Sequence, residues 1–428
     1  MQNRLTTGTL IFLFFISFSA SGQKLVNSPL SRFNLGMLEP AGSFRSLGMG
    51  GIGTSMRDNT SIFITNPASY SSLDTNSFIF DFGLDYSINK ISEGSARYSS
   101  DDVNFDHLII GFPLGKGMGL ALGVLPLSNG YYNMSETVKE GDGGYDPLTG
   151  GYTTLHSGEG GFTSFFLGSG VQLNRNFSAG INLSLLLGQV KRLNLFNFAD
   201  YYNVYNNNST EKLQLSGINF DYGVQYTASL KNNNFINAGV SLTSGKNYHT
   251  KYENISYRYT AYSSQDTLTY VSNDSTRSFI PGTLRIGLSA GKKNKFVVGI
   301  DYVTTKWTKA KIQGAYGSLG DTQSLLFGAE YIPEKFANYS YLRRVEYRLG
   351  GHIEDNYLVI NGKQIKEIGL TLGLGLPMRR SYSKTNLFFD YTKKSGSTAT
   401  SPHIENYFTF GISLNFYDDR WFHKRKYE

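Results

Sequence analysis

The stretch "YFTFGISLNF", residues 407–416, alternates strictly between two kinds of side chain. Every second residue is apolar, and the residues between are polar or small: Phe408, Phe410, Ile412, Leu414 and Phe416 against Thr409, Gly411, Ser413 and Asn415. Successive side chains of a β-strand point to opposite faces, so a period of two predicts a strand with one apolar and one polar face.

The same alternation recurs along most of the chain. It is clear in "FIFDFGLDYSI" (78–88), "FDYGVQYTASL" (220–230), "FVVGIDY" (296–302) and "EIGLTLGLGLPM" (367–378). Counting such segments predicts about fourteen strands, an even number within the range of membrane barrels. They begin near residues 77, 104, 117, 162, 177, 213, 234, 283, 295, 322, 341, 365, 385 and 405.

The connections between these strands alternate between short and long. Short turns are expected at 115–117, 174–176, 231–234, 292–295 and 379–384, and long polar loops at 127–161, 194–212, 248–282 and 305–321. Outer-membrane barrels have tight periplasmic turns and long outer loops, whereas a soluble β-sandwich has no reason for this rhythm. We therefore predict an all-β fold, a transmembrane antiparallel β-barrel of about fourteen strands.

The composition supports an exported β-rich protein. Residues 1–22 have a charged start at Arg4, an apolar run at 10–18 and a small-residue cleavage site, which predicts a cleaved signal peptide. The remaining chain has no apolar run of about 18 residues, so we expect no membrane-spanning helix. With no cysteine, it would enter an oxidising compartment without disulfides or a lipid-acceptor thiol.

These observations divide the chain into four predicted parts. Residues 1–22 are a signal peptide, 23–76 an N-terminal hatch in the lumen, 77–417 the transmembrane barrel and 418–428 a basic periplasmic tail. The expected location is the outer membrane. The formal charge of +7 is dispersed along the chain, so we expect no nucleic-acid partner.

The predicted hatch contains "RSLGMGGIGTSMRDNTSIFITNPASY", residues 45–70. A phosphate-binding loop needs a buried strand before it, a helix after it and a Lys-Ser/Thr pair or a later acid. These features are missing, so we interpret the glycines as positions of positive φ or of close backbone approach. Asn66 before Pro67 indicates a fixed bend at the entrance to the first strand.

This stretch resembles the N-terminal signature of the FadL/TodX-type outer-membrane transporters of hydrophobic compounds. The matching hatch-motif positions are Gly48, Gly50, Gly51, Asp58, Asn66, Pro67 and Ala68. "SRFNLGMLEP" (31–40) and "NPASYSSLDT" (66–75) look closer still to a Bacteroidota branch of that superfamily. The resemblance implies a hatch that plugs a fourteen-stranded barrel and passive uptake of a hydrophobic small molecule through the hatch-gated lumen.

The alternative function is a non-transporting scaffold. Relatives resembling the PorV component of type IX secretion hold partner proteins, so the chain is alternatively a subunit of a larger secretion or assembly complex. The expected partners are therefore outer-membrane lipids, and either a hydrophobic ligand or proteins that dock at the long loops or on the periplasmic tail.

Few residues qualify for chemistry. Phe44, Phe63 and Tyr70 of the hatch either pack the plug or line a ligand pocket. The six histidines show no pair at metal-ligand spacing, so we expect neither a metal nor another cofactor. No nucleophile motif stands on a strand-to-helix turn, which predicts no catalytic residues and no enzyme activity.

Overall fold

The structure is a computed structural model that describes residues 28–198, 204–260, 262, 265–315, 317–379, 381–397, 402–419 and 421. The predicted signal peptide and the first residues of the predicted hatch lie outside these described residues. So do Arg420, Lys424, Arg425 and Lys426 of the predicted tail.

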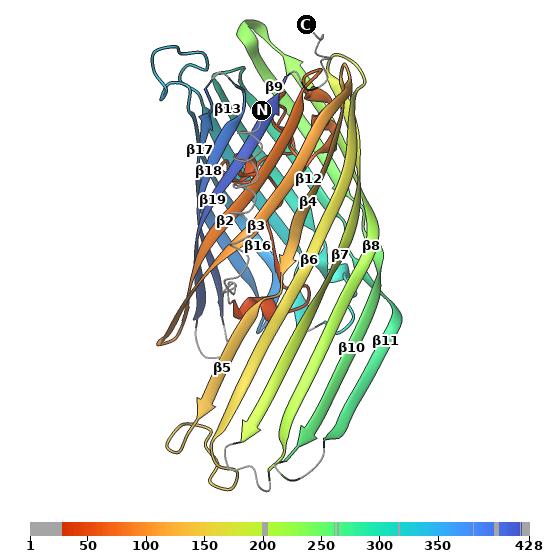
Figure 1. Ribbon diagram of the computed structural model, residues 1–428, viewed down its shortest axis with the longest axis vertical. Coiled ribbons are helices and arrows are strands. Elements are labelled where there is room, and N and C mark those ends of the chain that lie inside the picture. The colour runs from red at the N-terminus through yellow and green to blue at the C-terminus, as the bar shows by residue number, and fades with distance from the viewer. Residues whose placement is uncertain are drawn as a thin grey trace, which may run out of the picture.

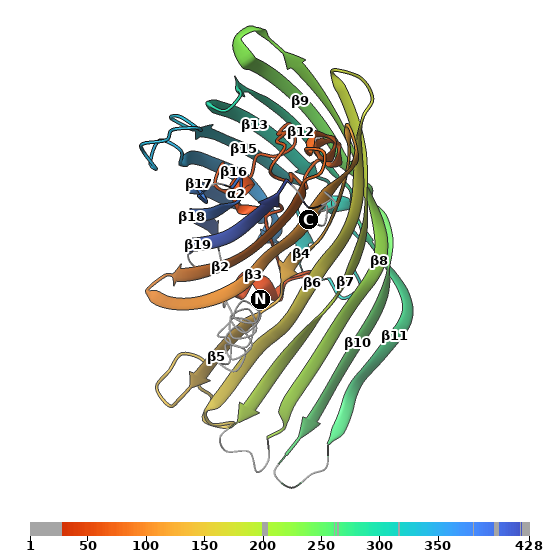
Figure 2. The same ribbon diagram turned by 45° about the horizontal axis from the view of Figure 1, so that its top comes forward.

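The strands form one antiparallel sheet that closes on itself (Figures 1 and 2). Its larger strands are β2 (Phe78–Glu93), β3 (Ala96–Gly115), β4 (Met118–Asn129), β5 (Tyr132–Val138), β6 (Tyr152–Gln172), β7 (Phe177–Phe198), β8 (Asn206–Ser229), β9 (Asn234–Thr243), β10 (Lys246–Tyr259), β11 (Asp266–Ile280), β12 (Thr283–Lys292), β13 (Phe296–Thr305), β15 (Thr322–Tyr331), β16 (Glu346–Ile360), β17 (Lys363–Pro377), β18 (Lys384–Ser397) and β19 (Pro402–Asp418). Closure occurs where β19 pairs with β2, from His403↔Glu93 to Asp418↔Phe78.

Some wall positions are shared by two labelled strands. β4 and β5 both pair with β6, β9 and β10 both pair with β8, and β11 and β12 take the next position against β10 and β9. The two-residue strand β14 (Ser318–Leu319) lies beside β15 on β16. Counted by wall position, the barrel has the predicted fourteen strands.

The outer surface carries the alternating apolar side chains. On β19, for example, Phe410, Ile412 and Leu414 are exposed, while the intervening Ser413 is buried inside. In hydrocarbon every backbone N–H and C=O needs a protein partner, and a closed sheet supplies one for each. The alternation therefore places the apolar face toward lipid, as the sequence predicted.

The two ends of the barrel differ. At one end the turns are short. Exposed aromatic side chains lie at or near the strand ends there: Phe177, Tyr226, Phe296, Tyr331 and Tyr347. Such a girdle of aromatic residues sits at a membrane–water interface. We call this end the short-turn rim, and the opposite end the long rim.

At the long rim the expected loops are largely strands, so the predicted loop boundaries were wrong. The 127–161 segment contains β5 and the start of β6, and 248–282 contains most of β10 and β11. Beyond the barrel these segments form a six-stranded outer sheet of β5, β6, β7, β8, β10 and β11, which extends past the other strands in Figure 1. Much of this sheet is polar, β11 above all, and there the alternation that marks strands in the membrane is missing.

Within the described residues, the helices are short. These are the α-helix α2 (Phe44–Leu47) and the 3₁₀ helices η2 (Pro29–Arg32), η3 (Pro67–Ser72), η4 (Lys231–Asn233) and η5 (Trp307–Lys309). Among the described residues no helix is long and apolar enough to cross a membrane. The described residues before β2, 28–77, lie inside the lumen, which confirms the predicted plugged barrel (Figure 2).

Candidate functional site: the hatch and the lumen around it

The hatch is the described part of the chain before β2, residues 28–77. It starts with η2 near β5 and β6, and its two-residue strand β1 (Met37–Leu38) pairs with Asn129 and Ser128 at the end of β4. It then runs through α2 to η3, which packs against β4, β6, β7 and β8. The hatch thus contacts the wall along most of the lumen's length.

Asn66 ties η3 to the wall. Its Oδ1 accepts the Ala68 N–H at 3.1 Å, which caps the helix, and its Nδ2 donates to the Thr54 carbonyl at 2.8 Å. The same Nδ2 reaches the carbonyls of Val224 on β8 and Val240 on β9, at 3.2 and 3.3 Å. Asn66 therefore caps a helix eleven residues before β2, rather than bending the chain at the first strand's entrance as we expected.

Wall glycines make room for η3. A Cβ at Gly223 would lie less than 3.0 Å from Asn66 and Pro67, and a Cβ at Gly119 or Gly170 would collide with the η3 backbone. Real Cβ atoms essentially never approach so closely. Pro67 at the first position of η3 lacks an N–H that would otherwise need a partner there. The Asn-Pro-Ala stretch therefore packs backbone against backbone, with Ala68 fully buried.

The glycine cluster after α2 also lets the hatch backbone approach the wall closely. Gly50 and Gly51 have φ values of +70° and +87°, which non-glycine residues rarely adopt. A Cβ on Gly50 would lie 2.5 Å from the carbonyl oxygens of Phe327 and Gly351 in the wall. The Gly50 N–H donates to Thr371 Oγ1 at 2.9 Å. The cluster, which also includes Gly48 against Gly373, is thus a tight turn seated on the wall.

Two buried wall side chains hold the next hatch residues. Asp301 Oδ2 on β13 accepts the N–H groups of Gly53 and Thr54, each at 2.8 Å. Gln225 Nε2 on β8 donates to the Thr54 carbonyl at 2.9 Å. Both side chains come from strands that are hydrogen-bonded into the wall, and both contact backbone atoms of the hatch. These contacts therefore hold the hatch backbone in place.

The strongest attachment is a buried network of six charges. Arg45 of α2 contacts Glu330 of β15 through two hydrogen bonds of 2.9 and 3.1 Å, and it contacts Asp58 of the hatch at 3.0 Å. Arg348 contacts Glu330 at 2.7 Å and also Glu346, which Lys384 contacts at 2.9 Å. We call these six residues the hatch ion network: Arg45, Asp58, Glu330, Glu346, Arg348 and Lys384.

The hatch ion network is electrically balanced, with three acids and three bases. The side chains of Arg45, Glu330 and Arg348 are 6%, 4% and 0% exposed. Removing one partner of a buried ion pair leaves a charge that neither water nor protein solvates, at a cost of about 3–5 kcal/mol. Within the network the Arg45–Glu330 pair joins the hatch to the wall, and the remaining pairs balance the charges of these two residues and their neighbours.

The network sets the titration of its hatch carboxylate. Burial of Asp58 raises its pKa, but the charges of Arg45, Lys384 and Lys335 and the Thr60 N–H outweigh burial and hold the pKa well below its usual range. For Arg45, burial opposes the charge, yet Asp58 and Glu330 hold its pKa well above the ordinary value. Both groups are therefore charged at neutral pH.

A pH dependence follows from the depressed pKa of Asp58. Its stabilising contribution is present above the unfolded pKa of about 4 and is lost as the pH falls toward the folded value. We expect the conductance of the barrel in planar bilayers to stay constant from pH 9 to 5 and to rise below pH 4. Asp58→Asn should remove this acid dependence, whereas a rise between pH 8 and 5 would contradict the assignment.

The three aromatic candidates of the hatch are buried against the wall. Phe44 stacks on Phe388 with ring centroids 5.3 Å apart and meets the edge of His107 at the same distance. Phe63 and Tyr70 are 2% and 1% exposed. Of the three, only Phe44 also borders the cavity described next.

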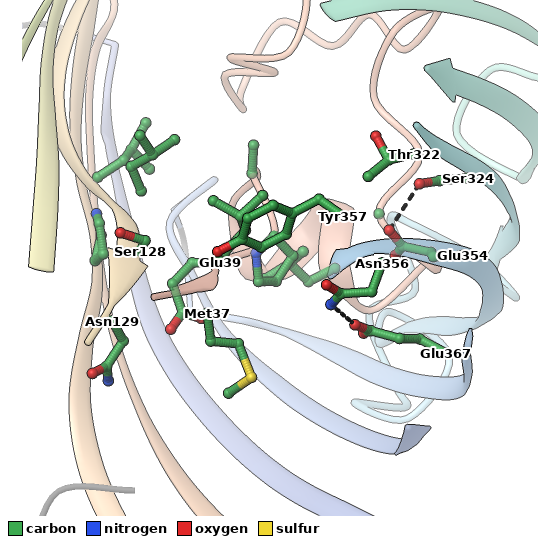
Figure 3. Close-up of a pocket in the computed structure, with 18 of the residues that line it drawn as sticks. Met37, Glu39, Ser128, Asn129, Thr322, Ser324, Glu354, Asn356, Tyr357 and Glu367 are labelled. Atoms are coloured by element: carbon green, nitrogen blue, oxygen red, sulfur yellow. Dashed lines mark hydrogen bonds between the residues drawn. The ribbon is translucent and has the colours of Figure 1, made fainter. Parts of the chain in front are cut away.

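A cavity of about 690 Å³ lies in the lumen between the hatch and the long rim (Figure 3). Hatch residues from Ser31 to Gly51 line one side, and strands from around the barrel line the rest. Figure 3 shows Met37 and Glu39 beside the Ser128–Asn129 edge of β4, with which β1 pairs, and Tyr357 on the side of the cavity nearer Asn356. Hydrogen bonds join Ser324 to Glu354, at 2.8 Å, and Asn356 to Glu367.

Carboxylates dominate the charged lining of the cavity. Seven of them line it: Glu39, Asp85, Asp106, Glu354, Asp355, Glu367 and Asp390. Arg285 and Lys394 are the permanently charged cations of this lining. Glu39 is exposed only to the cavity, and desolvation within the barrel raises its pKa to about 7 against the opposing charge of Lys394. Sequence reasoning missed this lining, because its residues come from strands far apart in the chain.

Chemically, these groups can anchor a plug and surround a polar space. Among the described residues no group of three or more His, Asp or Glu side chains is arranged to hold a metal ion. Buried His107 contacts two carboxylates, Asp81 and Asp106, and its Nε2 lies 3.2 Å from Asp81. They lie beneath Phe44, where they pack the hatch against β2 and β3.

The fold and the hatch together define a class: a fourteen-stranded barrel of the outer-membrane channel type, plugged by its own N-terminal segment. Solved members of this class are similar in fold. The chain matches a FadL homologue of Pseudomonas aeruginosa with a TM-score of 0.59 and 11% identity, over 89% of this chain and 99% of that one. It matches the toluene transporter TodX of Pseudomonas putida with a TM-score of 0.58 and 15% identity, over 89% and 99%. The CymD monoaromatic hydrocarbon channel gives 0.55 and 15%, over 90% and 99%.

The sequence itself identifies the family. The BamG family model matches residues 3–428, so the chain belongs to the BamG family. No curated protein sequence matches the chain. The identities to the channels are low, and those channels therefore establish the fold of this chain alone.

Proposed function

We propose that this protein is an outer-membrane scaffold, a non-transporting subunit of the barrel-assembly complex to which the name BamG refers. The observation that carries the proposal is the attachment of the hatch through the hatch ion network. A gate must be released at low cost, whereas this hatch is fixed by buried charges. We expect neither enzyme activity nor a cofactor.

The attachments argue for a permanent plug. Opening would separate Arg45 from Glu330, Asn66 from two wall carbonyls, and Asp301 from two backbone N–H groups. Each unmade buried hydrogen bond costs about 1–3 kcal/mol, and a broken buried ion pair costs more. No described element offers replacement partners, so spontaneous opening would be rare.

The cavity lining also favours a scaffold over a path for apolar solutes. A hydrophobic molecule in the cavity would cover carboxylates such as Glu39, Glu354 and Glu367 without hydrogen-bonding to them. Glu354 and Glu367 would keep their protein partners Ser324 and Lys394, but their other contacts with water would be lost, which is unfavourable for a charged group. Apolar and aromatic side chains, among them Phe44, Trp307 and Phe388, form much of the remaining lining, and ligand sites for apolar compounds are lined mainly by such side chains.

The outer sheet supplies surface for partners. Its edge strands β5 and β11 each pair on one side only along most of their length, with β6 and β10. Unpaired strand edges present backbone N–H and C=O groups to which another chain can add a strand. The position of this sheet beyond the membrane makes it accessible from outside the cell.

Depletion of the protein in the organism that encodes it tests the proposal. If the barrel is an assembly subunit, the amounts of unrelated outer-membrane barrels should fall within a few generations, and their unfolded precursors should accumulate. Re-expression of the chain should restore them. Normal levels of the other barrels, together with reduced uptake of a hydrophobic compound, would contradict the assembly role.

Passive transport of a hydrophobic compound is the second candidate, and the lumen cavity of about 690 Å³ is the observation that favours it. Under this reading a captured molecule would pass the hatch down its gradient. Asn66→Ala or Pro67→Ala would then loosen η3 and increase uptake several-fold, measured with a radiolabelled apolar compound in intact cells. If folded barrels of both variants leave uptake unchanged, the hatch does not gate transport.

A further inference from the structure

One connection at the short-turn rim departs from the pattern of the others. The turns there contain between two residues, from β3 to β4, and six, from β17 to β18. β15 ends at Tyr331 and β16 begins at Glu346, so the connection between them has fourteen residues, 332–345. We call this segment the β15–β16 loop; the sequence rhythm did not reveal it.

The base of the β15–β16 loop is firmly built. The Glu334 N–H donates to the Arg343 carbonyl at 2.7 Å, and the two side chains form an ion pair at 3.3 Å. Ile332, Ala337 and Val345 are buried beneath it. These contacts close the base of the loop and hold its two ends together.

The loop is also joined to the neighbouring turn between β12 and β13. The Ile332 N–H donates to the Lys295 carbonyl at 2.8 Å, and Lys335 Nζ donates to Asn294 Oδ1 at 3.0 Å. A hollow of about 390 Å³ lies beside this junction, and hatch residues Asn59 and Asp74 line its other side. The loop thus stands next to the end of the hatch.

The outer surface of the loop is apolar and fully accessible. Tyr339 is 103% exposed, and Phe336 and Leu342 are 66% and 67% exposed. The chain passes the aromatic girdle at Tyr331 and returns to it at Tyr347, so the loop lies beyond the level at which the girdle meets lipid headgroups. Neighbouring exposed aromatic and aliphatic side chains on a soluble surface mark protein-interaction sites.

Positive charge prevails on the loop and the adjoining turn, while Asp74 and Asp419 line the hollow beside Lys335 and Phe336. The loop and the adjoining turn carry six cations and one acid: Lys292, Lys293, Lys295, Lys335, Arg343 and Arg344, against Glu334. Glu334 is already paired with Arg343. Interfaces place positive patches against negative ones, which guides association and sets specificity.

We propose that the β15–β16 loop is the docking site for an acidic periplasmic protein. This partner would seat Phe336, Tyr339 and Leu342 in an apolar pocket and place carboxylates against the surrounding lysines and arginines. The inference rests on the proposed function, in which the barrel is a subunit of a complex, and it assigns the face and the partner chemistry. The closed base is preorganised, which reduces the entropy lost on binding.

Site-specific photocrosslinking tests the site. With p-benzoylphenylalanine in place of Tyr339, irradiated cells should give one discrete adduct with a soluble protein of low isoelectric point, identified by mass spectrometry. The same group in place of Leu148, an exposed residue between β5 and β6 on the long rim, is the control and should not capture that protein. An adduct with phospholipid alone, or with a basic protein, would overturn the proposal.

A variant separates this inference from the proposed function. The triple change Phe336→Ser, Tyr339→Ser and Leu342→Ser alters exposed side chains, and heat-modifiable migration on gels checks that the barrel folds. The crosslinked protein should co-purify at least about tenfold less with this variant than with the natural chain. If the natural chain purifies in a stable complex that the triple variant retains fully, the docking site is wrong and the scaffold function stands. If the natural chain purifies alone, the scaffold function itself fails.

Discussion

Arg45→Met should release the hatch and turn a closed barrel into a conducting one. Arg45 makes two hydrogen bonds to Glu330 and an ion pair with Asp58; Arg45 and Glu330 are buried, and Asp58 is 19% exposed. Methionine fills similar space but leaves both carboxylates short of a partner. The loss for a broken buried pair is about 3–5 kcal/mol, which shifts the closed-to-open ratio by more than a hundredfold. Single-channel recordings in planar bilayers measure the closed-to-open ratio directly.

The controls for this variant isolate the buried charge. Arg258→Met makes the same chemical change in the exposed pair with Asp266, whose side chains are 42% and 56% exposed. Exposed pairs contribute about 0–1 kcal/mol, so this barrel should stay closed. Adding Asp58→Asn to Arg45→Met removes one orphaned charge and should restore part of the closure. Equal conductance for Arg45→Met and the natural protein would show that the network does not hold the hatch.

Gly50→Ala should displace the hatch turn even though it adds a single methyl group. The position has φ +70°, which costs an L-residue about 1–2 kcal/mol. In addition, the new Cβ would lie 2.5 Å from two carbonyl oxygens of the wall, and backbone atoms cannot move aside as a flexible side chain can. We expect amide hydrogens of residues 48–54 to exchange at least tenfold faster, measured by mass spectrometry.

Gly115→Ala provides the matched control. Gly115 ends β3, has an ordinary φ, and no atom lies within 4 Å of the position its Cβ would take. Amide exchange in the hatch of the Gly115→Ala variant should therefore match that in the natural protein. Fast exchange in both variants would point to a general loosening of the barrel, and slow exchange in Gly50→Ala would refute the close seating of the turn.

The membrane-spanning part of the fold could be predicted from the sequence because lipid enforces its pattern. Residues such as Phe410, Ile412 and Leu414 must be apolar where they face hydrocarbon, so the period of two is strict there. The outer sheet faces water on both sides, and β11 reads as a polar stretch with no alternation, "DTLTYVSNDSTR" at 266–277. Where burial does not differ between two faces, the sequence carries no record of a strand.

The hatch motif could be recognised in the sequence, but the contacts that attach the hatch to the wall could not. The glycines and Asn66 stand out because turns and close backbone contacts demand particular residue types. Arg45, in "SFRSL" at 43–47, was not predicted to attach the hatch, because its partner Glu330 lies 285 positions away and a single sequence does not reveal such a pairing. The fourteen-residue β15–β16 loop was missed because a strand was expected to begin near residue 341, whereas β16 begins at Glu346.

A native mass spectrum of the protein, extracted gently from its own outer membrane, tests the central claim most directly. The account predicts a stoichiometric complex with other proteins, including components of the barrel-assembly machinery, and no small ligand held in the lumen. A lone barrel that carries a bound lipid-like mass would contradict it, and would establish the transport function in its place.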